Sequence, residues 1–246
     1  MLAGQPRRAY VLLGLEPELD CADGATARAA LQEADFVLSL SAFRTPAEEA
    51  FASVMLPVAL FAETAGTYIN AAGDWQGFDA AVNLPGEARP AWKVLRVIAN
   101  SLDLAGFDYM RLEEIRAELH RLLDDQAAEM EGSIAPSIEL AAPTTANGLE
   151  RITEVPMYSV DPLVRRAAGL QQTAEVTDDL LRLNPADAVR LGIDNDAAVR
   201  AWQGDASCLM RACHDPRLPV GSALIRACGP ATELGASFGM VRVEKA

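Results

Sequence analysis

The sequence predicts an α/β fold in its first half and a β-rich, barrel-like unit in its second half. Up to residue 57, short apolar runs alternate with helical patterns, which is typical of a parallel sheet covered by helices on both faces. After residue 150, short alternating segments are separated by glycine and proline turns, as in compact all-β units. Between the halves lies a stretch rich in proline, glycine and small polar residues. We therefore predict a domain over 1–130, a linker over 131–150 and a second domain over 151–246.

The first domain is expected to begin with three strands and two helices in alternation. Continuous apolar runs predict the strands at residues 10–15, 36–40 and 54–56. An alanine-rich segment predicts a helix over 24–34. Thr45 precedes Pro46, and a hydroxyl cap followed by proline at the first helical position predicts a second helix from 46 to about 52.

The rest of the first domain is expected to contain turns and two longer helices. Gly66-Thr67 and Gly73-Asp74 are predicted turns. Apolar residues at three- and four-residue steps predict a helix over 90–102. A further helix, capped by Asp108, is expected to reach about residue 130, with alternating charges on its outer face.

In the second domain, strands are expected at 152–158, 180–183, 197–203, 207–213 and 223–227. Asn184, Pro185 and Gly192 have the spacing of a cap, a first helical position and a helix end, so they bound a short helix. Gly204-Asp205 is expected to turn one strand back on the next as a hairpin.

Composition excludes several classes of function. The net charge of −14 over 246 residues argues against nucleic-acid binding and against docking on anionic lipid. No apolar run reaches the roughly 18 residues that a membrane-spanning helix needs, so no membrane insertion is expected. The chain starts close to its first strand, and we therefore expect it to be a piece of a longer protein.

No residue pattern predicts a catalytic or metal site. The four cysteines have neither iron–sulfur nor zinc spacing and are expected to be reduced: Cys21, Cys208, Cys213 and Cys228. His120 is expected at the surface, and His214 lies at a turn beside Cys213, where a nucleophile–base pair is unfavourable. Arg165 and Arg166 form a compact pair suited to gripping carboxylates on a neighbouring subunit, although solvated positions would explain them equally well.

The order of features over residues 54–100 resembles a segment of the molybdopterin oxidoreductase superfamily. It comprises a buried strand ending at Pro57, a carboxylate at Glu63, then Asn70, a glycine turn, and a helix that begins at Pro90. Three stretches are more specifically similar to the large iron–sulfur subunit of respiratory complex I, the NADH:quinone oxidoreductase. They are the Gln76-x-Phe78 pair, the run GEARPAWKVLR (residues 86–96) and the segment 157–173. The pattern over residues 184–193 resembles the superfamily's C-terminal double-psi barrel.

The resemblance implies a fold class: α/β, with a parallel-sheet Rossmann-like domain followed by a β-rich double-psi barrel-like domain. It also makes Glu63, Thr67 and Asn70 candidates for a vestigial cofactor site, unless they only secure a loop at an interface. Two departures weaken cofactor binding. The superfamily's Glu-Gly-Arg after the asparagine is Ala72-Gly73-Asp74 here, and its Gly-x-Asn-Pro turn is Gly14-Leu15-Glu16-Pro17, where Glu16 would repel phosphate.

The implied function is the C-terminal structural region of the complex I large iron–sulfur subunit, which braces the peripheral arm that carries electrons from NADH to quinone. The resemblance implies iron–sulfur clusters elsewhere in the parent protein, none in this chain, and other peripheral-arm subunits as partners. A cytoplasmic location, peripheral to the inner membrane, follows from the same resemblance. The alternative is a molybdopterin-dinucleotide-binding fragment of an enzyme similar to formate dehydrogenase or nitrate reductase.

Overall fold

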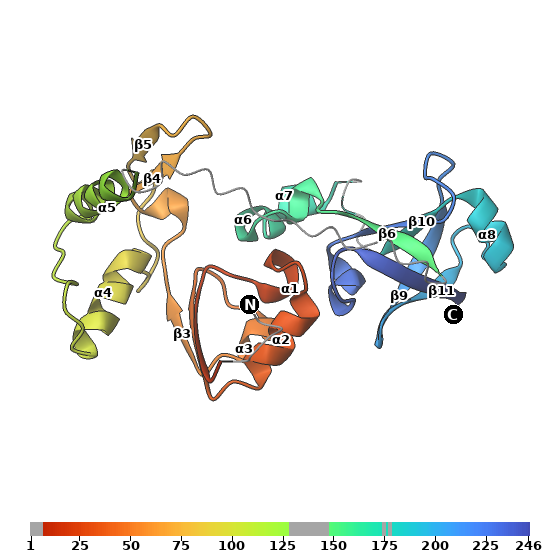
Figure 1. Ribbon diagram of the computed structural model, residues 1–246, viewed down its shortest axis with the longest axis horizontal. Coiled ribbons are helices and arrows are strands. Elements are labelled where there is room, and N and C mark those ends of the chain that lie inside the picture. Colours follow the sequence, from red (N-terminus) through yellow and green to blue (C-terminus); the bar gives the residue numbers. More distant parts are fainter. Residues whose placement is uncertain (1–6, 128–147, 174–175, 177–178) are drawn as a thin grey trace.

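The computed structural model describes residues 7–127, 148–173, 176 and 179–246, which form two halves of different architecture (Figure 1). The first half begins with a three-stranded parallel sheet in the order β1-β2-β3, made of Ala9–Leu13, Phe36–Ser41 and Val54–Pro57. Three helices accompany these strands: α1 (Pro17–Asp20), α2 (Gly24–Gln32) and α3 (Pro46–Glu49). The predicted alternation of strands and helices is confirmed. Thr45 is also confirmed as the N-cap of α3, because its hydroxyl accepts a hydrogen bond from the Glu48 N–H.

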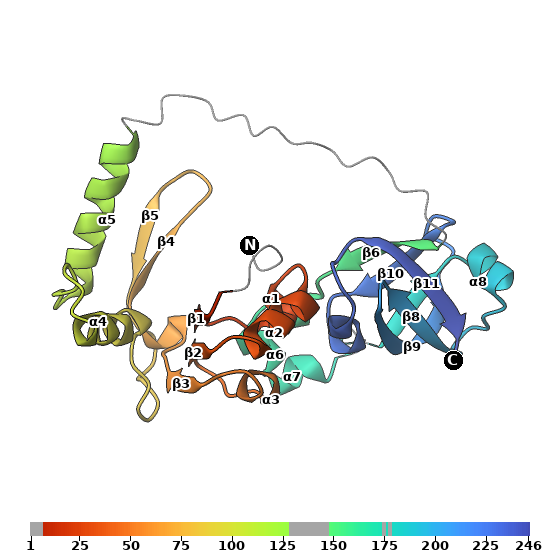
Figure 2. The same ribbon diagram turned by 60° about the horizontal axis from the view of Figure 1, so that its bottom comes forward.

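The two faces of this sheet are covered unequally. In Figure 2, α1, α2 and α3 lie on one side of the strands and α4 (Ala91–Ser101) lies on the other. Val37 packs with Leu31 and Phe51 on the first side. On the second side α4 packs over Leu40 and its neighbours. Other apolar residues of the sheet stay exposed: Val11, Leu13, Phe36 and Val54. The expectation that helices cover both faces therefore holds only in part.

The middle of the chain forms a hairpin and a long helix. β4 (Gly66–Ile69) pairs with β5 (Trp75–Phe78), so Gly66 and Thr67 lie in a strand and the predicted turn there is wrong. The helix α5 spans Leu112–Ala127. Asp108 does not cap it; instead the Glu114 carboxylate accepts hydrogen bonds from two N–H groups that precede the helix. Residues 128–147, which include most of the predicted linker, lie outside the described residues.

The second half is a closed barrel of six strands in the order β10-β6-β11-β8-β9-β7. The strands are β6 (Leu149–Glu154), β7 (Leu180–Leu183), β8 (Ala198–Gln203), β9 (Ala206–His214), β10 (Ser222–Arg226) and β11 (Gly239–Lys245). Two pairs are parallel, β6 with β10 and β7 with β9, and the rest are antiparallel. Inward side chains from all six strands form one core. The α/β fold class with a double-psi barrel-like second domain is confirmed.

The helix of the barrel half has the predicted ends, but two of its strands differ from the prediction. In α8 (Pro185–Leu191) the Asn184 side chain accepts from the Ala186 N–H, and Gly192 ends the helix at a φ of 66°, as predicted. The strand expected over 152–158 instead begins at Leu149, inside the predicted linker, and ends at Glu154. The closing strand β11 was not predicted.

Four short helical segments complete the second half: η2 (Met157–Ser159), α6 (Pro162–Arg165), α7 (Ala168–Gln171) and η3 (Gly229–Glu233). A short 3₁₀ segment, η1 (Phe61–Glu63), precedes the hairpin in the first half. None of the helices in the described part of the chain combines the length and apolarity that crossing a bilayer requires.

Candidate functional site

The candidate site is a cavity of about 320 Å³ between the two halves of the chain. Its walls come from the turn after β1 and from α1, from the segment η2–α6–α7, and from the start of η3. Polar side chains dominate one wall: Glu16, Tyr158, Arg165, Arg166 and Gln171. In open α/β sheets, the turns that follow the strands are the usual place for a ligand, which makes this cavity the first candidate for binding.

Local structure places Glu16, the acidic residue of the cavity wall, and its neighbour Asp20. β1 ends at Leu13, and Gly14 turns the chain with a φ of 58°, a region that favours glycine. Glu16 then precedes Pro17, which occupies the first position of α1. The Glu16 N–H donates to the Asp20 carboxylate at 2.7 Å, so the two acidic residues are held together around this short helix.

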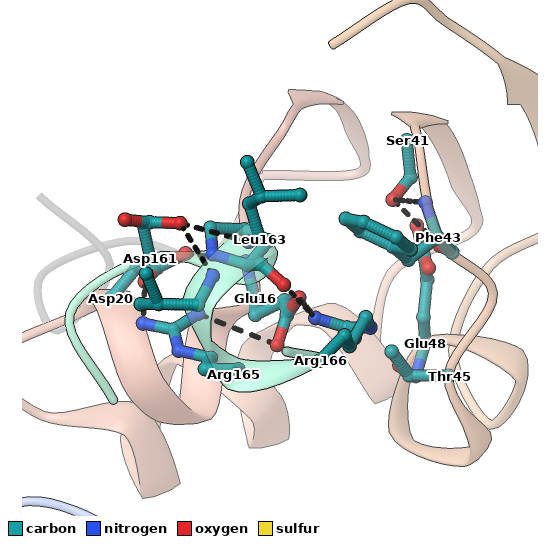
Figure 3. A network of polar contacts seen from close by, with 12 residues as sticks. Glu16, Asp20, Ser41, Phe43, Thr45, Glu48, Asp161, Leu163, Arg165 and Arg166 are labelled. Atoms are coloured by element: carbon teal, nitrogen blue, oxygen red, sulfur yellow. Dashed lines mark hydrogen bonds and ion pairs between the residues drawn. The ribbon is translucent and has the colours of Figure 1, made fainter. Parts of the chain in front are cut away.

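Local structure also places the two arginines. The Asp161 carboxylate accepts hydrogen bonds from the N–H groups of Leu163 (2.8 Å) and Val164 (3.0 Å), so it caps α6. Pro162 holds the first position of this helix. Arg165 is the last residue of this four-residue helix and Arg166 follows it. Both side chains extend toward Glu16 and Asp20 (Figure 3).

These four residues form an interdomain ion-pair cluster, defined here as Glu16, Asp20, Arg165 and Arg166 (Figure 3). Arg165 donates to Asp20 at 2.7 Å and lies 3.4 Å from Glu16. Arg166 donates to Glu16 at 2.7 Å and places its guanidinium 4.3 Å from the centre of the Phe43 ring. The Arg165 and Glu16 side chains are only 9% and 10% exposed, so the attraction between them is weakly screened by solvent.

The backbone around the cluster accepts further hydrogen bonds. Arg165 Nε donates to the Ser159 carbonyl at 2.8 Å, and Arg166 donates to the Pro162 carbonyl at 2.9 Å. Beside the cluster, the Ser39 hydroxyl donates a hydrogen bond to the buried carboxyl of Glu48. Burial raises the pKa of Glu48, because a charged carboxylate there loses its hydration.

A second contact between the halves lies beside the cavity. Arg28 of α2 donates to the Glu233 carboxylate through both terminal nitrogens, at 3.2 and 2.8 Å. The Ser237 N–H donates to the Ala22 carbonyl at 3.1 Å. The two halves therefore meet through directional polar contacts that involve both α1 and α2.

The predicted interface residues Arg165 and Arg166 do grip carboxylates, but within this chain. Their partners Glu16 and Asp20 lie 150 and 145 residues away in sequence. Sequence reasoning singled out Glu16 only as a residue that repels phosphate and missed Asp20 entirely. No local pattern connects residues so far apart, and only the acidic character of the β1–α1 turn was a usable signal.

The three cofactor candidates lie away from the cavity and apart from one another. The Glu63 carboxylate accepts from the Leu60 N–H and closes its own turn. Thr67 accepts from Arg116 Nε at 2.6 Å. Asn70 lies in the β4–β5 turn, where its oxygen accepts from the N–H groups of Ala72 and Asp74. Glu63 and Asn70 thus stabilise the turns in which they lie, and Thr67 joins the hairpin to α5.

The cysteines and histidines form no reactive pair in the described chain. None of the four cysteines forms a disulfide. His120 is exposed and stacks on Trp75, with ring centres 3.8 Å apart. His214 contacts the Ile193 carbonyl through Nε2 at 3.1 Å, whereas the Cys213 sulfur faces Arg182 at 3.4 Å. Within the described ranges, no three His, Cys, Asp or Glu side chains gather as metal ligands would.

Comparison with known proteins gives relatives of two kinds. Residues 2–101 match the sequence model of the molybdopterin oxidoreductase family. The alpha subunit of F420-dependent formate dehydrogenase 1 from Methanococcus maripaludis is 22% identical over 89% of this chain and 38% of its own length. A subunit of the NADH-quinone oxidoreductase from Streptomyces coelicolor is 37% identical over 47% of this chain and 14% of its own length.

A solved structure extends the similarity to the whole fold. Acetylene hydratase from Pelobacter acetylenicus superimposes with a TM-score of 0.66 over 99% of this chain and 45% of its own, at 14% sequence identity. The chain thus spans less than half of the length of each of these relatives. Residues 2–101 carry the sequence pattern of the molybdopterin oxidoreductase family, whose relatives here include both NADH-quinone oxidoreductase and formate dehydrogenase subunits.

Proposed function

We propose that this chain is the C-terminal structural region of the large iron–sulfur subunit of a NADH:quinone oxidoreductase. In this role it carries no cofactor and braces the arm of the complex in which other subunits and clusters move electrons from NADH toward quinone. The sequence similarity to the Streptomyces coelicolor subunit of such an enzyme supports this choice. The observation that carries it is that both arginines of the cavity already pair with the Glu16 carboxylate.

The residues of the cavity do not fit a pyrophosphate-bearing molybdopterin cofactor. Such a group needs N–H donors and cations that are free to meet phosphate. Here the Gly14 N–H donates to the Leu40 carbonyl, and the Glu16 N–H donates to Asp20. Both arginines of the cluster already pair with carboxylates, and an incoming phosphate would meet the negative charge of Glu16. The cluster instead joins the two halves as an internal ion pair.

A bracing role suits this arrangement. Domains that lack a large apolar contact move relative to each other unless other contacts hold them. The ion-pair cluster holds α6 against α1, and the Arg28–Glu233 pair holds α2 against η3, which packs on barrel strand β9. Held in one orientation, the two halves would present a fixed outer surface to neighbouring subunits. The proposed location is on the cytoplasmic side, peripheral to the inner membrane through the complex.

The alternative proposal is the molybdopterin-dinucleotide-binding region of an enzyme similar to formate dehydrogenase. One observation favours it: the match to the formate dehydrogenase subunit extends over 89% of this chain and therefore includes both halves. In this alternative the 320 Å³ cavity would widen around a cofactor once Glu16 leaves the arginines.

Metal and pterin analysis of the purified intact parent protein distinguishes the two proposals. Molybdenum and tungsten are measured by mass spectrometry, and pterin is measured by the fluorescence of its oxidised form. A formate dehydrogenase prepared in the same way is the positive control. We expect neither metal nor pterin to approach one equivalent per polypeptide. Stoichiometric metal together with pterin would overturn the structural proposal and establish the alternative.

A further inference from the structure

A second concave surface lies on the opposite side of the sheet from α1–α3. It is a groove of about 380 Å³ between β3 and α4. Its apolar floor is formed by Leu56, Val94, Val97 and Ile98, and its basic rim by Arg89, Lys93 and Arg96. Val97 is 54% exposed, although it lies in the middle of a helix whose other side packs on the sheet.

The floor of this groove continues onto the uncovered part of the sheet. Strand register aligns Val11 with Leu38 and Leu38 with Val54, so these side chains share the face that α4 covers. Val11 and Val54 are exposed at 60% and 40%. Parallel sheets are stable when both faces are covered, because their strands are apolar on both sides. This face therefore lacks part of its cover in the described chain.

The rim carries positive charge that the described chain does not neutralise. No described carboxylate lies within salt-bridge distance of Arg89, Lys93 or Arg96, whereas most other described arginines have such a partner. Arg96 donates to the Tyr109 carbonyl, and Lys93 lies over the Trp92 ring. Three cations without a carboxylate beside an apolar floor stand out in a chain with a net charge of −14.

We propose that this groove binds an acidic, amphipathic segment of a partner polypeptide. Apolar side chains of the segment would cover Val97 and its neighbours, while its carboxylates would pair with the rim. Lys93, Arg96 and Val97 are spaced three and four residues apart and so present one helix face to the partner. An amphipathic segment laid into an apolar groove is a common mode of recognition. The groove shares no residue with the cavity between the halves, so the cofactor test and this proposal stand or fall separately.

The two lysines of the sequence provide the readout. Lys93 lies on the rim of the groove, and Lys245 lies at the end of β11, 59% exposed beside Asp194. The full chain is treated with an amine-acetylating reagent, with and without a synthetic peptide of about 18 residues in which leucines recur at helical spacing and glutamates fill the other positions. We expect saturating peptide to slow acetylation of Lys93 about tenfold, while Lys245 reacts at an unchanged rate.

Two matched valine variants test the apolar floor. Val97→Asp places a carboxylate in the groove, and Val189→Asp makes the same change at an 83% exposed position on α8. Fluorescence anisotropy of the labelled peptide should report about tenfold weaker binding to V97D and unchanged binding to V189D. Circular dichroism establishes that both variants are folded.

Three results would overturn the proposal. The first is equal acetylation of Lys93 with and without the acidic peptide. The second is equal protection by a peptide in which lysine replaces every glutamate, because the rim charge would then play no part. The third is protection of Lys93 by vesicles of anionic phospholipid but not by the acidic peptide, which would assign the groove to a membrane surface.

Discussion

At the scale of single residues, the contact between α1 and α6 depends on two arginines: Arg165 pairs with Asp20 and Arg166 with Glu16, each at 2.7 Å. Arginine has several donors in one plane that suit carboxylates, and this property favoured carboxylate partners on a neighbouring subunit for Arg165 and Arg166, with solvated positions equally open. Their carboxylates lie at the start of the chain, because the α6 turn packs against α1. The candidates Glu63, Thr67 and Asn70 were chosen by resemblance, and their partners are local groups of the loop and hairpin or the neighbouring helix α5.

The buried thiol of Cys208 provides a prediction at this scale. Cys208 lies in β9 inside the barrel, and burial raises its pKa to about 11 although Arg151 favours the thiolate. Only the thiolate reacts with iodoacetamide. At pH 8 we therefore expect Cys208 in the folded chain to react about 100-fold more slowly than in the urea-unfolded chain.

Mass spectrometry of the alkylated peptides measures this rate, which should increase with pH in the folded chain over a wider range than in the unfolded chain. A raised pKa means that the thiolate fraction of the folded protein keeps increasing toward pH 11, whereas that of the unfolded chain levels off above its ordinary pKa of 9.0. Equal rates for folded and unfolded chains at pH 8 would contradict the buried position of the thiol.

At the scale of elements, helices with local caps were predicted well. Asn184 and Gly192 bound α8, and Thr45 caps α3, because a cap needs only residues within one turn of the helix end. The predicted cap of α5 was wrong, because Glu114, inside the helix, takes the capping role that Asp108 was expected to have. The β4–β5 pairing was missed because each strand has only four residues and neither has a buried one, so neither shows an alternating apolar pattern.

The close approach of α1 and α2 gives a prediction for these elements. A Cβ atom added to Gly24 would lie 2.7 Å from the Glu18 Cα and 2.8 Å from the Glu18 carbonyl oxygen, both of which are backbone atoms that cannot rotate away. Gly24→Ala should therefore lower the free energy of unfolding by about 1–3 kcal/mol through overpacking. Chemical denaturation with urea measures this change.

Gly169 provides the matched control. It also lies near the start of a helix, α7, and a Cβ added there meets no atom within 4 Å. Gly169→Ala should be neutral or stabilise by a few tenths to about 1 kcal/mol, because alanine restricts the unfolded chain. If both alanine variants had the same stability, the tight contact between α1 and α2 would be refuted.

At the scale of the whole molecule, polar contacts determine how the two halves are oriented. The ion-pair cluster joins α1 and the turn before it to α6, and the Arg28–Glu233 pair joins α2 to η3. Pairs at the protein surface contribute little to stability, whereas removal of one member of a largely buried pair leaves a charge without a partner. The clustered arginines should therefore couple the unfolding of the two halves.

Removal of the Arg165 side chain tests this coupling. Arg165→Ala leaves Glu16 and Asp20 without their shared partner, and we expect a loss of about 3–5 kcal/mol in coupling between the halves. Differential scanning calorimetry should show one transition for the original chain and two for R165A. The control is Arg8→Ala, which removes an exposed pair with Asp35 and should change stability by about 0–1 kcal/mol. A single transition in R165A at the original temperature would show that the cluster does not join the halves.

The sequence by itself determined the alternation of strands and helices up to residue 57, the α/β and β-rich division, and the ends of α8 and the start of α3. These features depend on periodicity and on contacts within a few residues, which a sequence displays directly. Only the tertiary structure decided the closure of the barrel by β11, the pairing of Glu16 and Asp20 with the two arginines, and the groove between β3 and α4. Each of these joins residues that are distant along the chain, and the energy of such a contact depends on packing that no local pattern records.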